Sequence, residues 1–169
     1  MKIAIAGAHR VGKTTLTEKL QEHLPDYTLN IEPYYELEES GYVFSERPDV
    51  DDFIKQFDFS IKQITKSGDN TIFDRCPIDI LAYIHAINET KDIQSFFNKA
   101  QTIITGIDLL VFVPVEEPDL IPCQKSDLPE LRYKVNEILN DWVWDFGAET
   151  IIVNGALLTR IDKILGKIS

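Results

Sequence analysis

The chain has 169 residues, of which 44% are hydrophobic and 27% charged, and its formal net charge is -11. This length and composition are typical of one globular domain with a sizeable core, and they exclude a long disordered tail. The acidic balance excludes a nucleic-acid surface, which needs clustered Lys and Arg side chains, but it is compatible with a small anionic substrate held by a few local cations.

Two further features of the sequence indicate the compartment. The apolar run after Lys2 is too short for a signal peptide, and no stretch approaches the ~20 apolar residues of a membrane span. The two cysteines, Cys76 and Cys123, have no metal-ligand spacing, so we expect free thiols in a reducing compartment. We therefore expect a cytoplasmic protein with neither a membrane nor a nucleic-acid partner, and the oligomeric state stays open.

The first pattern in chain order is a phosphate-binding motif. Residues 2–6 predict a short buried strand, and residues 7–14, GAHRVGKT, match the pattern G-x-x-x-x-G-K-[ST]. Leu16, Leu20 and Leu24 follow at intervals of four and predict a helix with one apolar face. The motif therefore has a strand before it and a helix after it, as a phosphate-binding loop (P-loop) requires.

The residue types of this loop fit nucleotide chemistry. Glycines let the backbone bend into a nest whose N–H groups point at phosphate oxygens, and the following helix adds its positive end. Lys13 can reach the β- and γ-phosphates, and the Thr14 hydroxyl can ligate Mg²⁺. His9 and Arg10 fill free positions and are interpreted as variable, although Arg10 is long enough to touch a phosphate. The expected nucleotide-binding residues are Gly7, Ala8, His9, Arg10, Val11, Gly12, Lys13, Thr14 and Thr15.

Strands and helices alternate along the rest of the chain. Short apolar or alternating runs predict strands at 27–31, 71–73, 108–113 and 149–153. Amphipathic spacing predicts helices at 49–66, 78–88, 91–105, 127–146 and 156–168, the fourth of them beginning with a capping box at Asp127 and Glu130. We therefore expect one domain, 1–169, with the α/β P-loop NTPase fold: a five-stranded parallel sheet, in the order 2-3-1-4-5, with helices on both faces.

Two acidic positions follow predicted strands. Glu32 comes after the second strand, and Asp74-Arg75 ends the third, so both should lie beside the glycine loop at the carboxyl edge of the sheet. Two plainer interpretations stay open: Asp74 and Arg75 form a surface ion pair, or Glu32 caps a helix or is simply solvated. The acceptor pocket is expected to be shaped by Tyr34, Tyr35, Phe53 and Gln56, but no motif names the acceptor.

With these motifs in place, the chain resembles the P-loop small-molecule kinases. The glycine loop, Glu32-Pro33 and the run from Asp74 to Tyr83 are similar to AAA-type kinase-like proteins related to ribosylnicotinamide kinase domains, and also to deoxynucleoside and thymidylate kinases. The resemblance implies that ATP is the phosphoryl donor and Mg²⁺ the cofactor. It also implies that Asp74 helps to hold Mg²⁺, that Arg75 steadies the acceptor or the transferring group, and that Glu32 takes the proton of the acceptor hydroxyl.

The segment 114–126 departs from that family. It carries three prolines and no periodicity, and we expect a lid, yet the arginines usual in such lids are missing. Only Lys125 and Arg132 supply positive charge, and Arg132 is expected to act on the phosphates when the lid closes. Asn154-Gly155 lies where related kinases hold the adenine, and Arg160 either stacks there or faces solvent.

These patterns leave three functions open. The first is an ATP- and Mg²⁺-dependent kinase whose partners are a nucleotide and a nucleoside-like small-molecule acceptor. The second is a regulatory ATPase or GTPase, of which the GTPase is disfavoured because the chain has no N-K-x-D motif. The third is a nucleotide-binding module without turnover.

Overall fold

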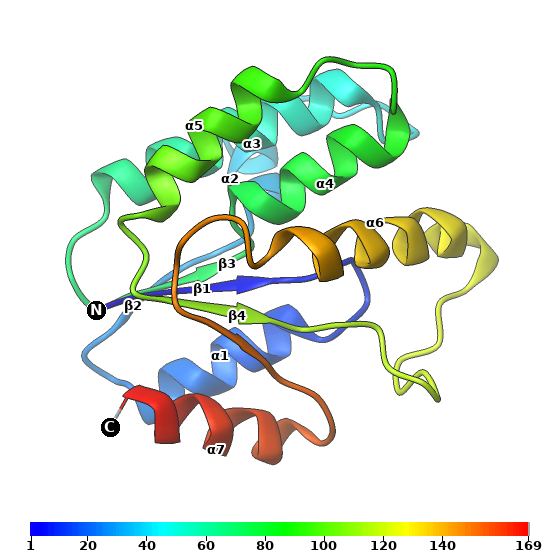
Figure 1. The fold of residues 1–169 in the computed structure, drawn as a ribbon. Coiled ribbons are helices and arrows are strands. Elements are labelled where there is room, and N and C mark those ends of the chain that lie inside the picture. Colours follow the sequence, from blue (N-terminus) through cyan, green and yellow to red (C-terminus); the bar gives the residue numbers. More distant parts are fainter. Residues whose placement is uncertain (169) are drawn as a thin grey trace.

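The computed structural model describes residues 1–168, and its strands form one five-stranded sheet in which every neighbouring pair is parallel. The strand order is β2-β3-β1-β4-β5. The predicted sheet, its direction and its order are thus confirmed (Figure 1). The strands are β1 (Lys2–Ala6), β2 (Thr28–Asn30), β3 (Thr71–Asp74), β4 (Leu109–Phe112) and β5 (Thr150–Ile152).

The three central strands carry the core. All four residues of β3 and of β4 are buried, as are the last four of β1, because helices cover both faces of the sheet. Ile3 of β1 pairs with Ile72 of β3 on one side and with Leu109 of β4 on the other. The edge strands β2 and β5 are only three residues long and only partly buried.

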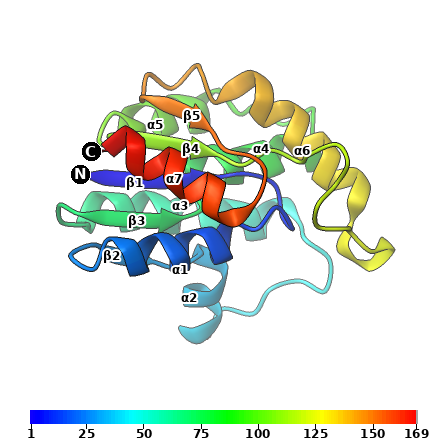
Figure 2. The same cartoon turned by 90° about the horizontal axis from the view of Figure 1, so that it is seen from below.

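Helices lie on both faces of the sheet, as predicted. In Figures 1 and 2, α1 and α7 lie on one face, and α3, α4, α5 and α6 lie on the other. The bounds are α1 (Lys13–His23), α2 (Pro33–Glu39), α3 (Val50–Lys66), α4 (Pro77–Ile87), α5 (Gln94–Ile104), α6 (Pro129–Trp142) and α7 (Leu157–Ile168).

Two local predictions need correction. The sequence analysis has no helix at α2, although Pro33 occupies the first helical turn, where its fixed φ and missing N–H are tolerated. The expected capping box at Asp127 is wrong, because Leu128, with φ at 52°, precedes α6 and no side chain caps the helix. Asp127 ends a short 3₁₀ helix (Lys125–Asp127) and pairs with Arg10 over 3.0 Å.

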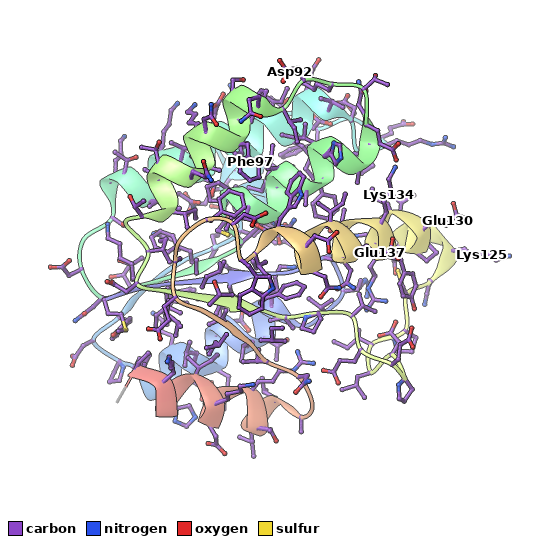
Figure 3. The ribbon with its side chains drawn as sticks, in the orientation of Figure 1. Asp92, Phe97, Lys125, Glu130, Lys134 and Glu137 are labelled. Carbon is purple, nitrogen blue, oxygen red and sulfur yellow. The ribbon has the colours of Figure 1, made fainter. Side chains whose placement is uncertain are left out.

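Aromatic side chains fill the space between α5 and α6. Phe97 of α5 meets Trp142 edge-on, with ring centroids 5.7 Å apart, and packs on Phe146 at 4.7 Å (Figure 3). α6 packs mainly on α4, and it carries Arg132, whose Nε donates to the carbonyl oxygen of His9 in the P-loop. No helix within residues 1–168 is long and apolar enough to cross a membrane.

Candidate active site

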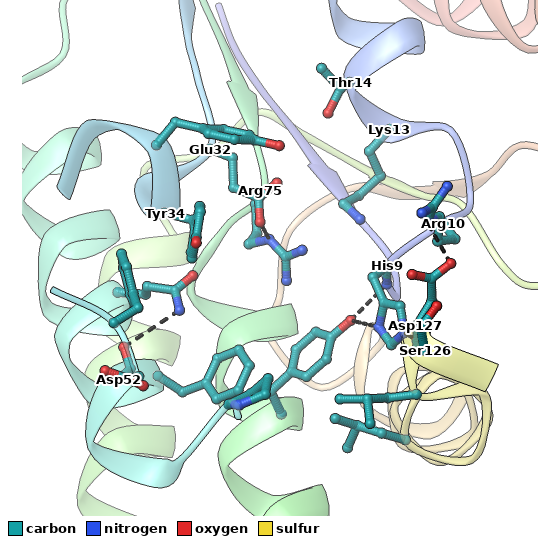
Figure 4. Close-up of a pocket in the computed structure, with 18 of the residues that line it drawn as sticks. His9, Arg10, Lys13, Thr14, Glu32, Tyr34, Asp52, Arg75, Ser126 and Asp127 are labelled. Carbon is teal, nitrogen blue, oxygen red and sulfur yellow. Dashed lines mark hydrogen bonds and ion pairs between the residues drawn. The ribbon is translucent and has the colours of Figure 1, made fainter. Parts of the chain in front are cut away.

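A cavity of about 680 Å³ opens beside the P-loop and the carboxyl ends of the strands. Its loop side consists of P-loop residues, and its aromatic side comes from α2, α3, α4 and residues 44–48. Figure 4 shows Lys13 and Thr14 on one side, Tyr34 and Asp52 on the other, and Arg75 between them. The loop side comprises His9, Arg10, Gly12, Lys13, Thr14 and Thr15, and the aromatic side includes Tyr34, Tyr35, Phe44, Glu46, Asp52, Phe53, Gln56 and Tyr83.

Both glycines of the P-loop are required by its shape. A Cβ atom on Gly7 would lie 2.5 Å from the carbonyl oxygen of Val113, so the loop passes too close to the residue that follows β4 to carry a side chain there. Gly12 has a φ of 86°, in the left-handed region that favours glycine. Ala8 and Val11 are buried and do not line the cavity, so they can contribute to a ligand only through their backbone.

Basic side chains hold four consecutive carbonyl groups of the P-loop. Each of these carbonyl groups therefore has a protein donor. Two donors come from helices far along the chain, α6 and α7. The bonds are Lys13 Nζ to Ala8 O (2.6 Å), Arg132 Nε to His9 O (3.0 Å), Arg132 Nη2 to Arg10 O (2.8 Å) and Arg160 Nη1 to Val11 O (2.8 Å).

The Lys13 ammonium is buried against its own loop. Burial, together with the nearby charge of Arg75, lowers the pKa of Lys13 to about 8. To contact a terminal phosphate, the ammonium has to exchange the carbonyl oxygen of Ala8 for a phosphate oxygen. A phosphate oxygen in this place would bring a negative charge beside Lys13. This charge would raise the pKa of the ammonium back towards its usual value.

Thr14 and Asp74 come together across the sheet edge as predicted. The Thr14 hydroxyl donates to Asp74 Oδ2 over 2.7 Å, while Asp74 Oδ1 is buried and has no hydrogen-bond partner. Burial raises the pKa of Asp74, although the Thr14 hydrogen bond opposes this. An unpartnered carboxylate oxygen beside a hydroxyl fits Mg²⁺, which takes one or two protein ligands together with phosphates and water. Within residues 1–168, no group of three or more His, Cys, Asp or Glu side chains forms a metal site.

Arg75 lies at the centre of the cavity and is not a surface residue. It and Asp74 are 6% and 2% exposed, which rules out the surface ion pair. The Arg75 Nε lies 2.8 Å from Glu32 Oε1, its Nη1 lies 3.8 Å from Asp79 Oδ2, and its guanidinium lies over the Tyr83 ring at 5.2 Å. Burial opposes the charge, but the two carboxylates outweigh it and raise the pKa of Arg75. The φ of 83° at Arg75 is a strained value for a side-chain-bearing residue, as occurs at functional sites.

Glu32 occupies the N-cap position of α2, but its side chain caps nothing. The capping interpretation is therefore wrong. Its carboxylate is only partly exposed and engages Arg75 through Oε1. This arrangement leaves the other oxygen, Oε2, for a ligand in the cavity.

Asp79 is a site residue that sequence analysis missed. It is fully buried, accepts a hydrogen bond from the Cys76 N–H over 2.8 Å, and lies beneath Arg75. Burial raises the pKa of Asp79 to about 6, although the charge of Arg75 opposes the rise. The available signal was its position one helical turn after Arg75, at the start of the helix that Pro77 begins.

Tyr83 and His9 connect three elements around the cavity. The Tyr83 hydroxyl oxygen accepts from the His9 backbone N–H over 2.6 Å and lies 2.7 Å from His9 Nδ1. His9 Nε2 lies 2.5 Å from the carbonyl oxygen of Asp127, so one P-loop side chain bridges α4 and the segment before α6. Burial lowers the pKa of His9, and the charges of Arg75 and Lys13 add to this effect.

The aromatic side presents flat surfaces to the cavity. Tyr34 stacks on Phe44 with ring centroids 4.3 Å apart, and Phe53 stacks on Tyr83 at 4.8 Å. The buried Gln56 lines the cavity beside them. The four residues expected to shape an acceptor pocket, namely Tyr34, Tyr35, Phe53 and Gln56, all line this cavity.

Comparison with known families identifies the chain. A family model described as an AAA domain matches residues 2–160. The chain belongs to this AAA domain family. No curated protein matches it. The resemblance to P-loop kinases that the sequence indicated is confirmed by this match together with the similar solved structures.

Three of those structures show the breadth of this fold. Deoxyadenosine kinase from M. mycoides has a TM-score of 0.65 and 19% identity, covering 99% of this chain and 98% of that one. Thymidylate kinase from Ehrlichia chaffeensis has a TM-score of 0.71 and 15% identity, covering 99% and 98%. A NadR protein in complex with NR has a TM-score of 0.73 and 18% identity, and the match covers 99% of this chain but 49% of that one. At these identities the similarity establishes the P-loop NTPase fold alone.

In this AAA domain, the segment 114–126 lies against the P-loop. Ile121 and Ser126 line the cavity, whereas Lys125 is exposed and points away from the fold (Figure 3). Arg132 is 1% exposed and is paired with Asp119 of the segment, with Nη1 2.5 Å from Oδ2. Its guanidinium therefore contacts the back of the P-loop and not the cavity.

The proposed adenine-binding pair of the AAA domain is also held by this segment. The Gly155 N–H donates to Glu116 Oε1 over 2.8 Å, and neither Asn154 nor Gly155 lines the main cavity. Arg160 does not face solvent as one interpretation had it: it is 6% exposed and bonds both Gly155 O at 2.9 Å and Glu116 Oε1 at 2.7 Å. Both cysteines are free thiols, as predicted, with Cys76 buried.

Proposed function

We propose that this AAA domain is a cytoplasmic kinase that uses ATP and Mg²⁺ to phosphorylate a hydroxyl of a nucleoside-like small molecule. One observation carries the proposal: a carboxylate paired with a buried arginine, Glu32 with Arg75, lines the same cavity as the phosphate-binding residues Lys13 and Thr14. Phosphoryl transfer needs a proton acceptor and charge neutralisation in one enclosed space. The kinases of similar fold support this assignment.

The proposed reaction divides these roles among the residues of the cavity. The acceptor oxygen attacks the γ-phosphorus, the bond from that phosphorus to the departing ADP oxygen breaks, and Glu32 Oε2 takes the hydroxyl proton. Lys13 and Arg75 oppose the negative charge that spreads over the transferring group. Thr14 and Asp74 would hold Mg²⁺, which supplies further charge neutralisation between the phosphates.

The adenine is proposed to lie beside Asn154 and Gly155. The Gly155 N–H is bonded to Glu116, so a base in this place would contact the outer side of this turn. Phosphates on the loop side and a base near residues 154–155 leave the aromatic side for the acceptor. The stacked rings there are suited to a flat base because aromatic groups pack face to face or edge to face.

A regulatory ATPase is the second candidate, and one observation favours it. Positive charge from the lid is scarce, because Lys125 is exposed and the Arg132 guanidinium is bound to Asp119 and loop carbonyls. A lid that adds no cation to the phosphates would slow transfer to an acceptor more than it would impair nucleotide binding. A binding module without turnover would follow from the same feature.

The deciding experiment measures ADP formation with and without a panel of acceptors. The panel contains deoxyadenosine, thymidine and ribosylnicotinamide, each with MgATP, and the Lys13→Ala variant is the control. A kinase forms ADP faster when its acceptor is present, and a phosphorylated acceptor accumulates in equal amount. ADP formation that no acceptor accelerates would favour the ATPase and contradict the kinase.

A further inference from the structure

The proposed reaction leaves the charge of Asp79 without a role. Asp79 is 0% exposed and follows Arg75 by one helical turn, at the start of α4. Its Oδ1 accepts a hydrogen bond from the Cys76 N–H over 2.8 Å, while its Oδ2 is buried and has no hydrogen-bond partner among residues 1–168. Nη1 of Arg75 lies 3.8 Å from this Oδ2. One carboxylate oxygen thus serves the helix, and the other lies beside the charge of Arg75.

The helix alone does not require a charged residue at position 79. The N–H of Cys76 needs one acceptor, and an asparagine oxygen would supply it. The positive end of the helix favours a carboxylate only modestly, whereas burying a carboxylate is costly unless an opposite charge compensates it. Burial raises the pKa of Asp79 to about 6, and among the groups that oppose this rise Arg75 has the largest effect. Arg75 is therefore the main reason why a negative charge is tolerated here.

Arg75 keeps part of its guanidinium available to a ligand. Its Nε lies 2.8 Å from Glu32 Oε1 and its Nη1 lies near Asp79, whereas Nη2 has neither a hydrogen bond nor an ion pair within the described part of the chain. The guanidinium lies between Lys13 and Tyr34 in the cavity (Figure 4). Arginine binds phosphoryl oxygens through the N–H groups of its planar fork. The two carboxylates therefore hold Nε and Nη1 and leave Nη2 for an oxygen of the transferring group.

The two carboxylates differ in what the proposed reaction does to them. Glu32 lines the cavity and takes the proton of the acceptor hydroxyl, which removes its negative charge. Asp79 is closed off from solvent and does not line the cavity, so it stays out of this proton transfer. When Glu32 becomes neutral, Asp79 remains beside Arg75 as the carboxylate that compensates its charge.

We infer that Asp79 is a positioning residue for phosphoryl transfer, which holds Arg75 in place so that Nη2 can receive the transferring group. This inference rests on the proposed kinase function and deepens it. A long side chain without fixed partners samples many rotamers, and fixing it before the reaction removes part of the entropic cost of transfer. Asp79 acts only through Arg75, so loss of its charge should slow transfer without weakening the binding of MgATP.

Asp79→Asn tests this role because it keeps an acceptor oxygen for the Cys76 N–H and removes the charge. ADP formation is measured with MgATP and whichever of deoxyadenosine, thymidine and ribosylnicotinamide accelerates the wild-type protein most. The kcat should fall about 10- to 100-fold, the scale of a slightly misplaced reacting group, while the KM for ATP stays within about twofold. The control is Asp92→Asn, the same substitution at the exposed start of α5, where Asp92 accepts the Gln94 N–H over 2.9 Å, and it should leave kcat unchanged.

A double-variant cycle separates action through Arg75 from a general structural role. If Asp79 acts only through Arg75, adding Asp79→Asn to Arg75→Met should change kcat by no more than about twofold, whereas independent roles predict that the two losses multiply. Circular dichroism and urea denaturation check that each variant folds. If Arg75→Met does not fold, Arg75→Lys replaces it, because lysine lacks the planar fork, and Asp79→Asn should then cost less in this background than in the wild type.

The outcomes distinguish this inference from the kinase assignment. If an acceptor accelerates the wild-type protein but Asp79→Asn is equally active, or if the losses in the cycle multiply, the positioning role is wrong and the kinase stands. A KM for ATP that rises in step with the fall in kcat also overturns the role, because Asp79 would then support the nucleotide site as a whole. If no acceptor accelerates ADP formation by the wild type, the kinase assignment fails and the positioning role fails with it.

Discussion

The Nε atom of Arg132 donates to the carbonyl oxygen of His9 over 3.0 Å, although 123 positions separate the two residues. The same guanidinium holds Arg10 O and the Asp119 carboxylate. Arg132 thus joins α6, the 114–126 segment and the P-loop. In this arrangement it supports the loop that binds phosphate, and a direct contact with phosphate would require these bonds to break.

Replacing Arg132 with Ala should slow phosphoryl transfer by about 10²-fold, the scale of a small misplacement of the phosphate-binding loop. It should also lower the free energy of unfolding by about 1–3 kcal/mol, because the carbonyls of His9 and Arg10 lose their buried donor. Steady-state kinetics and urea denaturation measure the two effects. If Arg132 acts through the loop, the KM for ATP rises together with the loss in kcat.

Asp119→Asn separates the two possible roles of Arg132. The substitution weakens the ion pair but leaves the bonds to His9 and Arg10 intact. A loop-supporting Arg132 predicts a small effect on kcat. Faster transfer in Asp119→Asn would mean instead that the released guanidinium reaches the phosphates, as the sequence analysis expected.

Lys13→Ala should abolish measurable MgATP affinity while leaving the fold intact, because it removes the cation aimed at the terminal phosphates. The fold should tolerate the change because the buried ammonium has a lowered pKa and does not favour the folded state. Calorimetry measures the affinity, and circular dichroism checks the fold. Equal ATP binding by variant and wild type would contradict the assignment of the P-loop.

Binding of ATP should be accompanied by proton uptake near pH 8. The Lys13 pKa is about 8 without ligand, so about half of these side chains are neutral at that pH. Phosphate charge raises the pKa, and the protein should take up about half a proton at pH 8 and almost none at pH 6.5. Calorimetry in buffers of different ionisation enthalpy measures the number of protons taken up when ATP binds. The control is Lys13→Arg, whose side chain stays charged. If this variant takes up as many protons as the wild type, the uptake does not come from Lys13.

Asp74→Asn and Glu32→Gln should impair different steps. Asp74→Asn should weaken the Mg²⁺ dependence and the activity together, because it removes a carboxylate that has an unpartnered oxygen beside Thr14. Glu32→Gln should lower kcat with little change in ATP affinity, since only the proton acceptor is lost. Initial rates measured over a range of Mg²⁺ concentrations distinguish the two variants. Normal turnover by Glu32→Gln on its best acceptor would make Glu32 structural.

Ligands should protect the 114–126 segment if it acts as a lid. Lys125 is exposed in this structure, and trypsin should cut after it. A non-hydrolysable ATP analogue added together with an acceptor should slow this cleavage, because closure excludes the segment from solvent. Cleavage after the exposed Lys62 of α3 is the reference site. Equal rates at Lys125 in both states would indicate a passive connection.

Much of the fold was predictable because apolar residues repeat with different periods along strands and along helices. The P-loop motif fixed the location of the site, and parallel strands bring Glu32 and Asp74 to the same sheet edge. The helix α2 was not predicted because its seven residues are too few to establish a period. Leu128, in a left-handed conformation, shifted the start of α6 away from the expected cap, a tertiary effect that local propensity does not contain.

The surroundings of Arg75 and Arg132 could not be predicted for a different reason. Sequence analysis treats a basic residue near a phosphate site as a ligand for phosphate. Whether its charge is free depends on acids that reach it through the fold, such as Glu32, or on the residue at 119 that approaches Arg132. These pairings are properties of tertiary structure, and they decide which cations a substrate can use.

The bonds that hold the P-loop also have a consequence for how the protein is made. The loop is synthesised before α6 and α7, but its carbonyls at His9 and Val11 receive hydrogen bonds from Arg132 and Arg160, which follow them by 123 and 149 positions. A nascent chain that has completed β1 and α1 already contains the whole motif without the donors that shape it. Folding of the loop should therefore be a late event that depends on contacts distant in sequence, which are slow to form. Nucleotide affinity would then appear only when α7 has docked, so a bound nucleotide would report that nearly the whole chain has folded.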